Sequence, residues 1–83
     1  MSPLWPDGRP IEVTILAERP REFRWRFRTH RIQRVSDHWR IHAGWWATEL
    51  WRDYWEVTTH SGLFCVLYCD LLAGRWYLER IYE

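Results

Sequence analysis

The sequence contains no lysine: all 12 of its basic residues are arginine, and 11 acidic residues reduce the formal net charge to +1. A domain that binds phosphates over its whole surface would need a larger positive excess, so nucleic-acid binding is restricted to a local patch. No apolar run approaches the roughly 20 residues of a membrane-spanning helix, and no signal-type segment opens the chain. We therefore expect a cytoplasmic protein that does not enter a membrane.

Cysteine and glycine are scarce, with two and four residues. Cys65 and Cys69 stand four positions apart in an expected strand, which would separate them by about 13 Å and exclude a disulfide between them. The two thiols and the four histidines of the chain are not spaced as ligands on the turns of a zinc site. The isolated glycines form no phosphate-binding loop. The sequence therefore predicts neither a metal nor another cofactor.

No set of residues indicates a catalytic centre. If Cys65 or Cys69 acted as a nucleophile, His60 would be its general base, but no third group is placed to orient the histidine. Asp53 and Glu56 are an odd number of positions apart on an expected strand, so their carboxylates lie on opposite faces and cannot act on one substrate. We therefore predict that the protein is not an enzyme.

Aromatic residues are abundant, with eight tryptophans, four tyrosines and three phenylalanines in 83 residues, and 47% of the chain is apolar. A core is feasible at this length without a disulfide or a metal. Residues 1–10 hold three of the four prolines and are predicted to form a flexible N-terminal arm. Residues 11–83 are predicted to form a single antiparallel β domain.

Apolar and polar residues alternate with a period of two along the first half of this domain, which predicts strands. Residues 11–20 are predicted to form the first strand. In the next, Phe23, Trp25 and Phe27 are expected to face the core while the intervening arginines face water. The third strand continues towards Ile41, and residues 36–38 interrupt its alternation as a turn or a bulge.

The second half begins with a stretch that lacks this alternation. Residues 42–51 are expected to form a Trp-rich linker, with room for one short helical turn, whose tryptophans cap an open edge of the core. Residues 52–59, 63–70 and 75–82 are predicted to be strands joined by short glycine-containing loops. The predicted fold is all-β, a small antiparallel meander or half-barrel of five to six strands.

Several features follow one another in a recognisable order: Phe23-Arg24-Trp25-Arg26, Trp45-Trp46, Arg52-Asp53-Tyr54-Trp55-Glu56-Val57, Gly62 and Trp76-Tyr77-Leu78. This order resembles a small uncharacterised bacterial domain that occurs as stand-alone proteins and is similar to the C-terminal end of ImuB, a catalytically inactive relative of the Y-family DNA polymerases. The resemblance implies an accessory role in bacterial translesion synthesis and DNA damage tolerance, through contacts with that machinery. The chain lacks the polymerase regions of ImuB, and its single glutamine, Gln33, begins no sliding-clamp motif.

The residues themselves favour protein docking. Trp, Tyr and Arg are enriched at the energetic centres of interfaces, and eight tryptophans exceed what so small a core can easily enclose. A patch that pairs with a second copy of the chain is a further possibility, and the oligomeric state stays open. The candidate partner-binding residues are Trp39, Trp45, Trp46 and Trp51.

The alternative function is single-stranded nucleic-acid binding. Seven arginines and two acidic residues lie between Arg21 and Arg40. Arginines two apart on one strand would be spaced by about 6.6 Å, near the spacing of phosphates in a stretched single strand, and exposed tryptophans would supply stacking. Acidic residues on neighbouring strands would instead neutralise this ladder. The candidate residues are Arg24, Arg26, Arg28, Arg31, Arg34 and Arg40.

Overall fold

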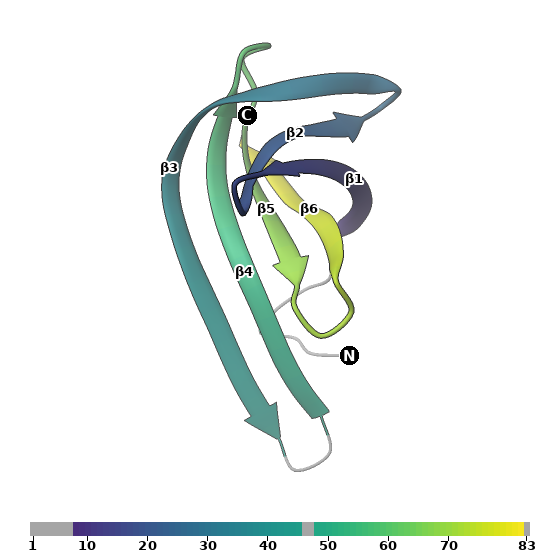
Figure 1. Cartoon of the computed structure of the whole chain (residues 1–83), viewed down its shortest axis with the longest axis vertical. Helices are drawn as coiled ribbons and strands as arrows, with labels where there is room; N and C mark the ends of the chain where they lie inside the picture. The colour runs from purple at the N-terminus through teal and green to yellow at the C-terminus, as the bar shows by residue number, and fades with distance from the viewer. Residues whose placement is uncertain (1–7, 46–47, 83) are drawn as a thin grey trace.

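The computed structural model describes residues 8–45 and 48–82, and the side chains of all of these except Trp45 and Thr48. The described residues form six antiparallel strands, which close into a barrel in sequence order (Figure 1). The strands are β1 (Arg9–Leu16), β2 (Arg19–Trp25), β3 (Arg28–Trp45), β4 (Thr48–Thr59), β5 (Phe64–Asp70) and β6 (Arg75–Tyr82). The predicted all-β antiparallel fold is confirmed. None of the described segments is a helix of the length and apolar character that crossing a membrane requires.

The first two connections are two-residue turns with positive φ at both positions. Ala17 and Glu18 have φ of 52° and 63°, and Arg26 and Phe27 have φ of 52° and 64°. Positive φ at both central residues is typical of type I′ hairpin turns, which match the twist of the flanking strands. Phe27 is 94% exposed, so the prediction that it faces the core is wrong. The reason is that β2 ends at Trp25, and the alternation ends with it.

β3 is the longest strand and belongs to two hairpins. Its first residues, Arg28–Arg31, pair with β2, and from Ile32 onward it pairs with β4. The register shifts between Ile32 and Arg34 and again between Val35 and Asp37, so Gln33 and Ser36 are bulge residues. The bulge predicted at residues 36–38 is confirmed at its first position. Bulges bend a strand, and β3 sweeps away from β2 to run alongside β4 (Figure 1).

The predicted Trp-rich linker is instead the distal part of the β3–β4 hairpin, and the helical turn predicted there is wrong. β3 and β4 stay paired from Ile32–Thr59 to Trp45–Thr48. β5 pairs only with Arg52–Thr58 of β4. The paired residues beyond Arg52 therefore form a two-stranded ribbon that projects from the barrel (Figure 1), in keeping with molecular dimensions of 41 × 28 × 23 Å.

The core lies inside the barrel. Alternate residues of β4 and β5 supply four of its six buried members, because side chains two apart point to the same face of a strand. Its buried members are Phe23, Trp55, Val57, Cys65, Leu67 and Leu78. β6 matches its predicted range and β5 begins one residue later than predicted, whereas β4 begins at Thr48, four residues before the predicted start. Positive φ at Gly62 and Gly74 accounts for the glycines in their loops.

The barrel closes where β1 meets β6, through pairs that begin at Arg9–Leu78. β1 therefore starts inside the segment predicted as a flexible arm, and residues 1–7 of that arm lie outside the described residues. Gly8 precedes the closure, and a Cβ built on it would lie 2.5 Å from the carbonyl oxygen of Leu78. Only glycine allows this close approach of the two backbones.

Candidate interaction surfaces

The predicted arginine ladder does not lie on one strand. β2 ends at Trp25, Arg26 lies in the turn and Arg28 opens β3, so the chain reverses direction inside the ladder. Arg24 lies opposite Glu12, whereas Arg28 lies opposite Trp25 and therefore on the other face of the sheet. The regular spacing of about 6.6 Å, expected for one continuous strand, does not arise.

The other three predicted arginines are separated from one another. Arg31 lies opposite Glu22 of β2. Arg34 lies further along β3, beyond the bulge residue Gln33. Arg40 lies on β3 opposite Asp53, at the base of the projecting ribbon, with its Nε 3.5 Å from Oδ1 of Asp53. All six predicted arginines are exposed, but acidic neighbours accompany several of them and they form no single groove.

An aromatic and cationic cluster occupies the β2–β3 tip, which we define as residues 25–28. Two guanidinium groups lie over the ring of Trp25, with Cζ of Arg9 at 5.7 Å and Cζ of Arg26 at 5.3 Å from the ring centroid. The next residue, Phe27, projects an almost fully exposed ring from a backbone conformation that non-glycine residues rarely adopt. An exposed ring beside cations is the combination that single-stranded nucleic-acid-binding proteins use.

The β3–β4 hairpin carries a polar hairpin face, consisting of His38, Arg40, His42, Glu49, Trp51 and Asp53. Its distal members, His42, Glu49 and Trp51, lie on the projecting ribbon. Near the barrel, Nε2 of His38 lies 2.9 Å from Oδ1 of Asp53, a hydrogen bond in which the imidazole donates. The same imidazole stacks on Trp55, with 3.6 Å between ring centroids. Asp53 thus joins His38 and Arg40, two neighbouring side chains of the same face, and fixes both.

Further along the same face a second group repeats this arrangement. Oε1 of Glu49 accepts hydrogen bonds from Nε1 of Trp51 at 2.7 Å and from Nε2 of His42 at 2.9 Å. The imidazole of His42 stacks on Trp51, with 3.9 Å between the ring centroids. The hydrogen bond from Trp51, followed by that from His42, lowers the pKa of Glu49 below its ordinary value, because both stabilise the carboxylate.

The opposite face of the hairpin begins an aromatic row that crosses four strands: Trp39, Tyr54, Tyr68 and Tyr77. Adjacent ring centroids are 5.3, 5.2 and 5.0 Å apart. Cζ of Arg52 lies 4.3 Å from the ring centroid of Tyr68, and its Nη1 donates to the hydroxyl of Tyr54 at 3.2 Å. Burial raises the pKa of Tyr54. The row is thus a second packed layer outside the barrel, with Trp39 half-buried at its end.

The four predicted partner-binding tryptophans do not form one patch. Trp39 pairs with Tyr54 and Trp51 pairs with His42, which places the two tryptophans on opposite faces of the hairpin. Trp45 is the last residue of β3, and its side chain lies outside the described part of the chain, as does Trp46 altogether. The prediction that Trp51 caps an open edge of the core is wrong, because it stacks on His42 on the projecting ribbon.

The two cysteines are free and lie on β5, as predicted. Burial in the core raises the pKa of Cys65 to about 11. Burial, with smaller contributions from the carboxylates of Asp53 and Asp70, also raises the pKa of Cys69. Both thiols therefore stay protonated near neutral pH, which suppresses their reactivity as nucleophiles. Within residues 8–45 and 48–82, no three His, Cys, Asp or Glu side chains are grouped so that they could hold a metal ion.

A family model described as Domain of unknown function (DUF6504) matches residues 8–83. The chain belongs to the DUF6504 family. No curated protein and no solved structure matches it. The match confirms the predicted relationship to a small uncharacterised domain, and the DUF6504 domain includes all six strands of the described barrel.

The residues that sequence reasoning missed in this DUF6504 domain lie where the chain turns. Phe27 continues the alternation of Phe23 and Trp25, which predicts that its ring faces the core. A two-residue hairpin turn is normally signalled by Asn-Gly, Asp-Gly or Gly-Gly, and Arg26-Phe27 carries no such signal. The sequence offers no role for His38 and His42 other than metal ligation, whereas in the structure their partners are indoles and carboxylates across the hairpin.

Proposed function

We propose that this domain is a non-catalytic docking module that binds a protein partner through its projecting β3–β4 hairpin and acts in bacterial translesion synthesis. The observation that carries the proposal is the polar hairpin face, whose rings and charges are held in place before any partner arrives. Hydrogen bonds fix the imidazoles of His38 and His42, and both rings stack on indoles. Side chains ordered in advance lose less conformational entropy on binding.

The composition of the hairpin also suits an interface. Trp and Arg are the residues most enriched at energetic hot spots. Trp51 and Arg40 lie on the polar hairpin face, and Trp39 lies at the edge of the aromatic row on the other side. Each of the two indoles is half-buried, so each has surface left to contribute to a contact. A ribbon that projects beyond β5 can reach into a cleft of a partner, which a closed barrel surface cannot do.

The link to translesion synthesis is supported by the resemblance of residues 20–83 to the domain that is similar to the C-terminal end of ImuB. The raised pKa of Cys65 supports a non-catalytic role, since a buried thiol that stays protonated is a poor nucleophile. The partners to test first are therefore the bacterial translesion polymerase and the proteins of the mutagenesis cassette.

The experiment measures binding of these purified proteins to the immobilised domain by biolayer interferometry. Trp51→Ala and Trp39→Ala are compared with Phe27→Ala, an exposed aromatic residue away from the hairpin. Thermal melts establish that each variant is folded. We expect Trp51→Ala to weaken binding at least about tenfold, the effect of truncating a hot-spot residue, while Phe27→Ala binds as the parent does. If no candidate protein binds, the assignment to translesion synthesis fails. If one binds equally to all three variants, the hairpin is not the docking site.

A second candidate function, single-stranded nucleic-acid binding, is favoured by the β2–β3 tip. Phe27 offers an exposed ring for a base to stack on, and the guanidinium groups of Arg9 and Arg26 lie over Trp25, which precedes the same turn. The test is a tryptophan-fluorescence titration with a (dT)12 oligonucleotide at about 50 and 200 mM salt, because phosphate contacts make affinity salt-dependent. Phe27→Ala should abolish saturable quenching and Trp51→Ala should preserve it. Absence of quenching in the parent protein removes this function.

A further inference from the structure

An arginine groove separates β2 from β3. The two strands pair only between Glu22–Arg31 and Trp25–Arg28, and beyond these pairs they diverge. Arg19–Arg21 of β2 then continue along β1, while Ile32–Val35 of β3 continue along β4. The space left between them has a volume of about 390 Å³, within the range of about 300–1,000 Å³ that is usual for ligand sites.

Strand pairing does not close this groove, for two local reasons. Pro20 has no N–H to donate across it, and the bulges at Gln33 and Ser36 disrupt the facing edge of β3. The same features protect an edge against the addition of a further strand. A ligand is therefore held here by side-chain contacts rather than as an additional strand of the barrel.

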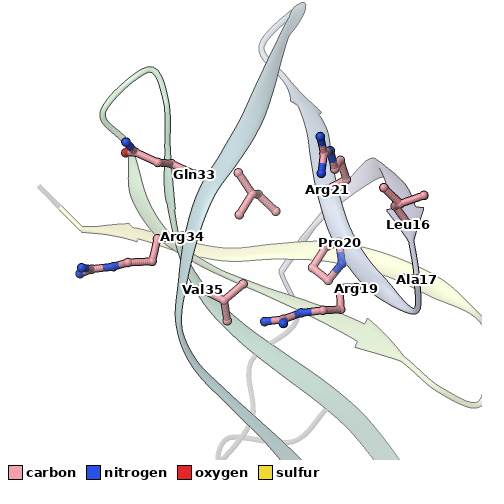
Figure 2. A pocket seen from close by; sticks show the side chains of 9 residues that line it. Leu16, Ala17, Arg19, Pro20, Arg21, Gln33, Arg34 and Val35 are labelled. Carbon is pink, nitrogen blue, oxygen red and sulfur yellow. The ribbon is translucent and has the colours of Figure 1, made fainter.

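The walls of the groove are aliphatic and its charges are positive. Pro20 and Val35 face each other across it, and Arg19 extends from β2 towards β3 (Figure 2). Arg21 lines the groove from the same strand, whereas Arg34 points to the far side of β3 (Figure 2). None of the described residues that line the groove is acidic. A carboxylate that enters it meets cations without a competing anion.

The side chain of Arg19 also lies over a buried tryptophan. Cζ of Arg19 is 5.7 Å from the centroid of the Trp55 ring. Nε1 of Trp55 is buried and has no hydrogen-bond partner among the side chains and backbone groups that the structure describes. Arg19 therefore connects the groove to this indole, so a ligand bound to Arg19 would change the surroundings of the Trp55 ring.

We infer that the arginine groove binds an acidic peptide segment of a partner protein, with an aliphatic side chain between Pro20 and Val35 and flanking carboxylates on Arg19 and Arg21. The lining contains no aromatic ring, which argues against a nucleobase, because single-stranded nucleic acids are held by stacking on aromatic side chains. The groove is separate from the projecting hairpin, so this inference does not depend on the docking function proposed for the hairpin.

The experiment selects a random 12-residue peptide library, displayed on phage, against the whole domain. We expect enriched peptides to carry an aliphatic residue flanked by Asp or Glu. The affinities of synthetic copies are then measured for Arg19→Gln, Arg21→Gln and the control Arg24→Gln, an exposed arginine of β2 outside the groove. Loss of one charged contact should weaken binding by about tenfold in either groove variant and leave the control unchanged. Arg21→Gln keeps the Arg19–Trp55 contact, so it remains informative if Arg19→Gln does not fold.

Nuclear magnetic resonance spectra of the labelled domain locate the peptide. The indole N–H signal of Trp55 should shift on peptide addition, and that of Trp51 on the hairpin should not. The inference is overturned if no peptide is enriched, if enriched peptides lack acidic residues, or if they bind the groove variants as tightly as the parent. It is also overturned if (dT)12 rather than a peptide binds the domain and this binding is lost in Arg19→Gln and Arg21→Gln. The same holds if the parent domain self-associates and these variants do not, because the groove would then hold a second copy of the chain. Trp51→Ala should retain peptide binding, so failure of the groove and failure of the hairpin proposal are distinguishable.

Discussion

Replacing Arg26-Phe27 by Asn-Gly should stabilise the protein while removing the exposed ring at the β2–β3 tip. Both residues have positive φ, at 52° and 64°, a region that disfavours side chains other than those of Gly and Asn by about 1–2 kcal/mol per residue. Relief at two positions gives about 2–4 kcal/mol. The greater freedom of glycine in the unfolded chain opposes it by about 1 kcal/mol. Loss of the Arg26–Trp25 contact removes about 0.5–1 kcal/mol more, so a net gain of about 1 kcal/mol is expected.

The β1–β2 turn provides a matched control. Ala17 and Glu18 have nearly the same φ values, 52° and 63°, and no aromatic ring projects from this turn. Ala17→Asn with Glu18→Gly should therefore stabilise by about 1–3 kcal/mol, slightly more than the tip variant, because no cation–π contact is lost.

Urea denaturation followed by tryptophan fluorescence measures the free energy of unfolding of both double variants, and calorimetry measures their melting temperatures. For a domain of this size, 1 kcal/mol corresponds to a rise of about 4–8 °C. If the tip takes part in nucleic-acid binding, the Arg26→Asn, Phe27→Gly variant should gain stability and lose affinity for (dT)12. The Ala17→Asn, Glu18→Gly variant should gain stability only. The reasoning about backbone strain is refuted if neither variant unfolds at a higher urea concentration than the parent.

Three further predictions concern the core, the barrel closure and the hairpin. Burial raises the pKa of Cys65 from 9.0 to about 11. The contribution of this thiol to the free energy of unfolding is therefore fully present below about pH 9 and declines by about 2–3 kcal/mol as the pH rises towards 11. Cys65→Ala should flatten this decline when urea unfolding is measured at a series of pH values. Gly8→Ala would place a Cβ 2.5 Å from the Leu78 carbonyl oxygen and should destabilise the barrel by about 1–3 kcal/mol in thermal or urea unfolding, whereas an unchanged midpoint would contradict the close approach of β1 and β6. The hydrogen bonds of Glu49 lower its pKa, so its contribution to stability is present above the unfolded-state pKa and is lost as the pH falls through the folded-state pKa. Trp51→Phe removes one of the donors. This variant should return the folded-state pKa of Glu49 towards its ordinary value in an NMR titration of the carboxyl carbon.

The second half of the fold could be predicted closely because its signals are local. Three β-prone runs are separated by loops in which Gly62 and Gly74 adopt positive φ, so composition and turn chemistry agree. The first half carries weaker signals. Both of its turns lack glycine and asparagine, and the long β3–β4 ribbon carries a Trp-rich segment without alternation, so a linker was expected where paired strands are found.

The candidate surfaces were predicted less well than the strands. The alternating pattern predicts that Arg24, Arg26 and Arg28 face water, and all three are exposed. Their arrangement as a ladder depends on Arg24 and Arg28 sharing a strand, which a turn at Arg26-Phe27 prevents. The arginine groove has no sequence signal at all, because its walls come from strands that pair nearby and then diverge.

An all-β domain rich in aromatic residues follows directly from the sequence, because the period of two along each strand is a local property of the chain. Other features arise only when the chain is folded: which strand lies beside which, where Phe27 and the arginines point, and the groove that β2 and β3 leave between them. These features depend on bulges, on turn geometry and on barrel closure. Each of them couples residues that are distant in the chain, and a one-residue change in register moves every side chain of a strand to its other face.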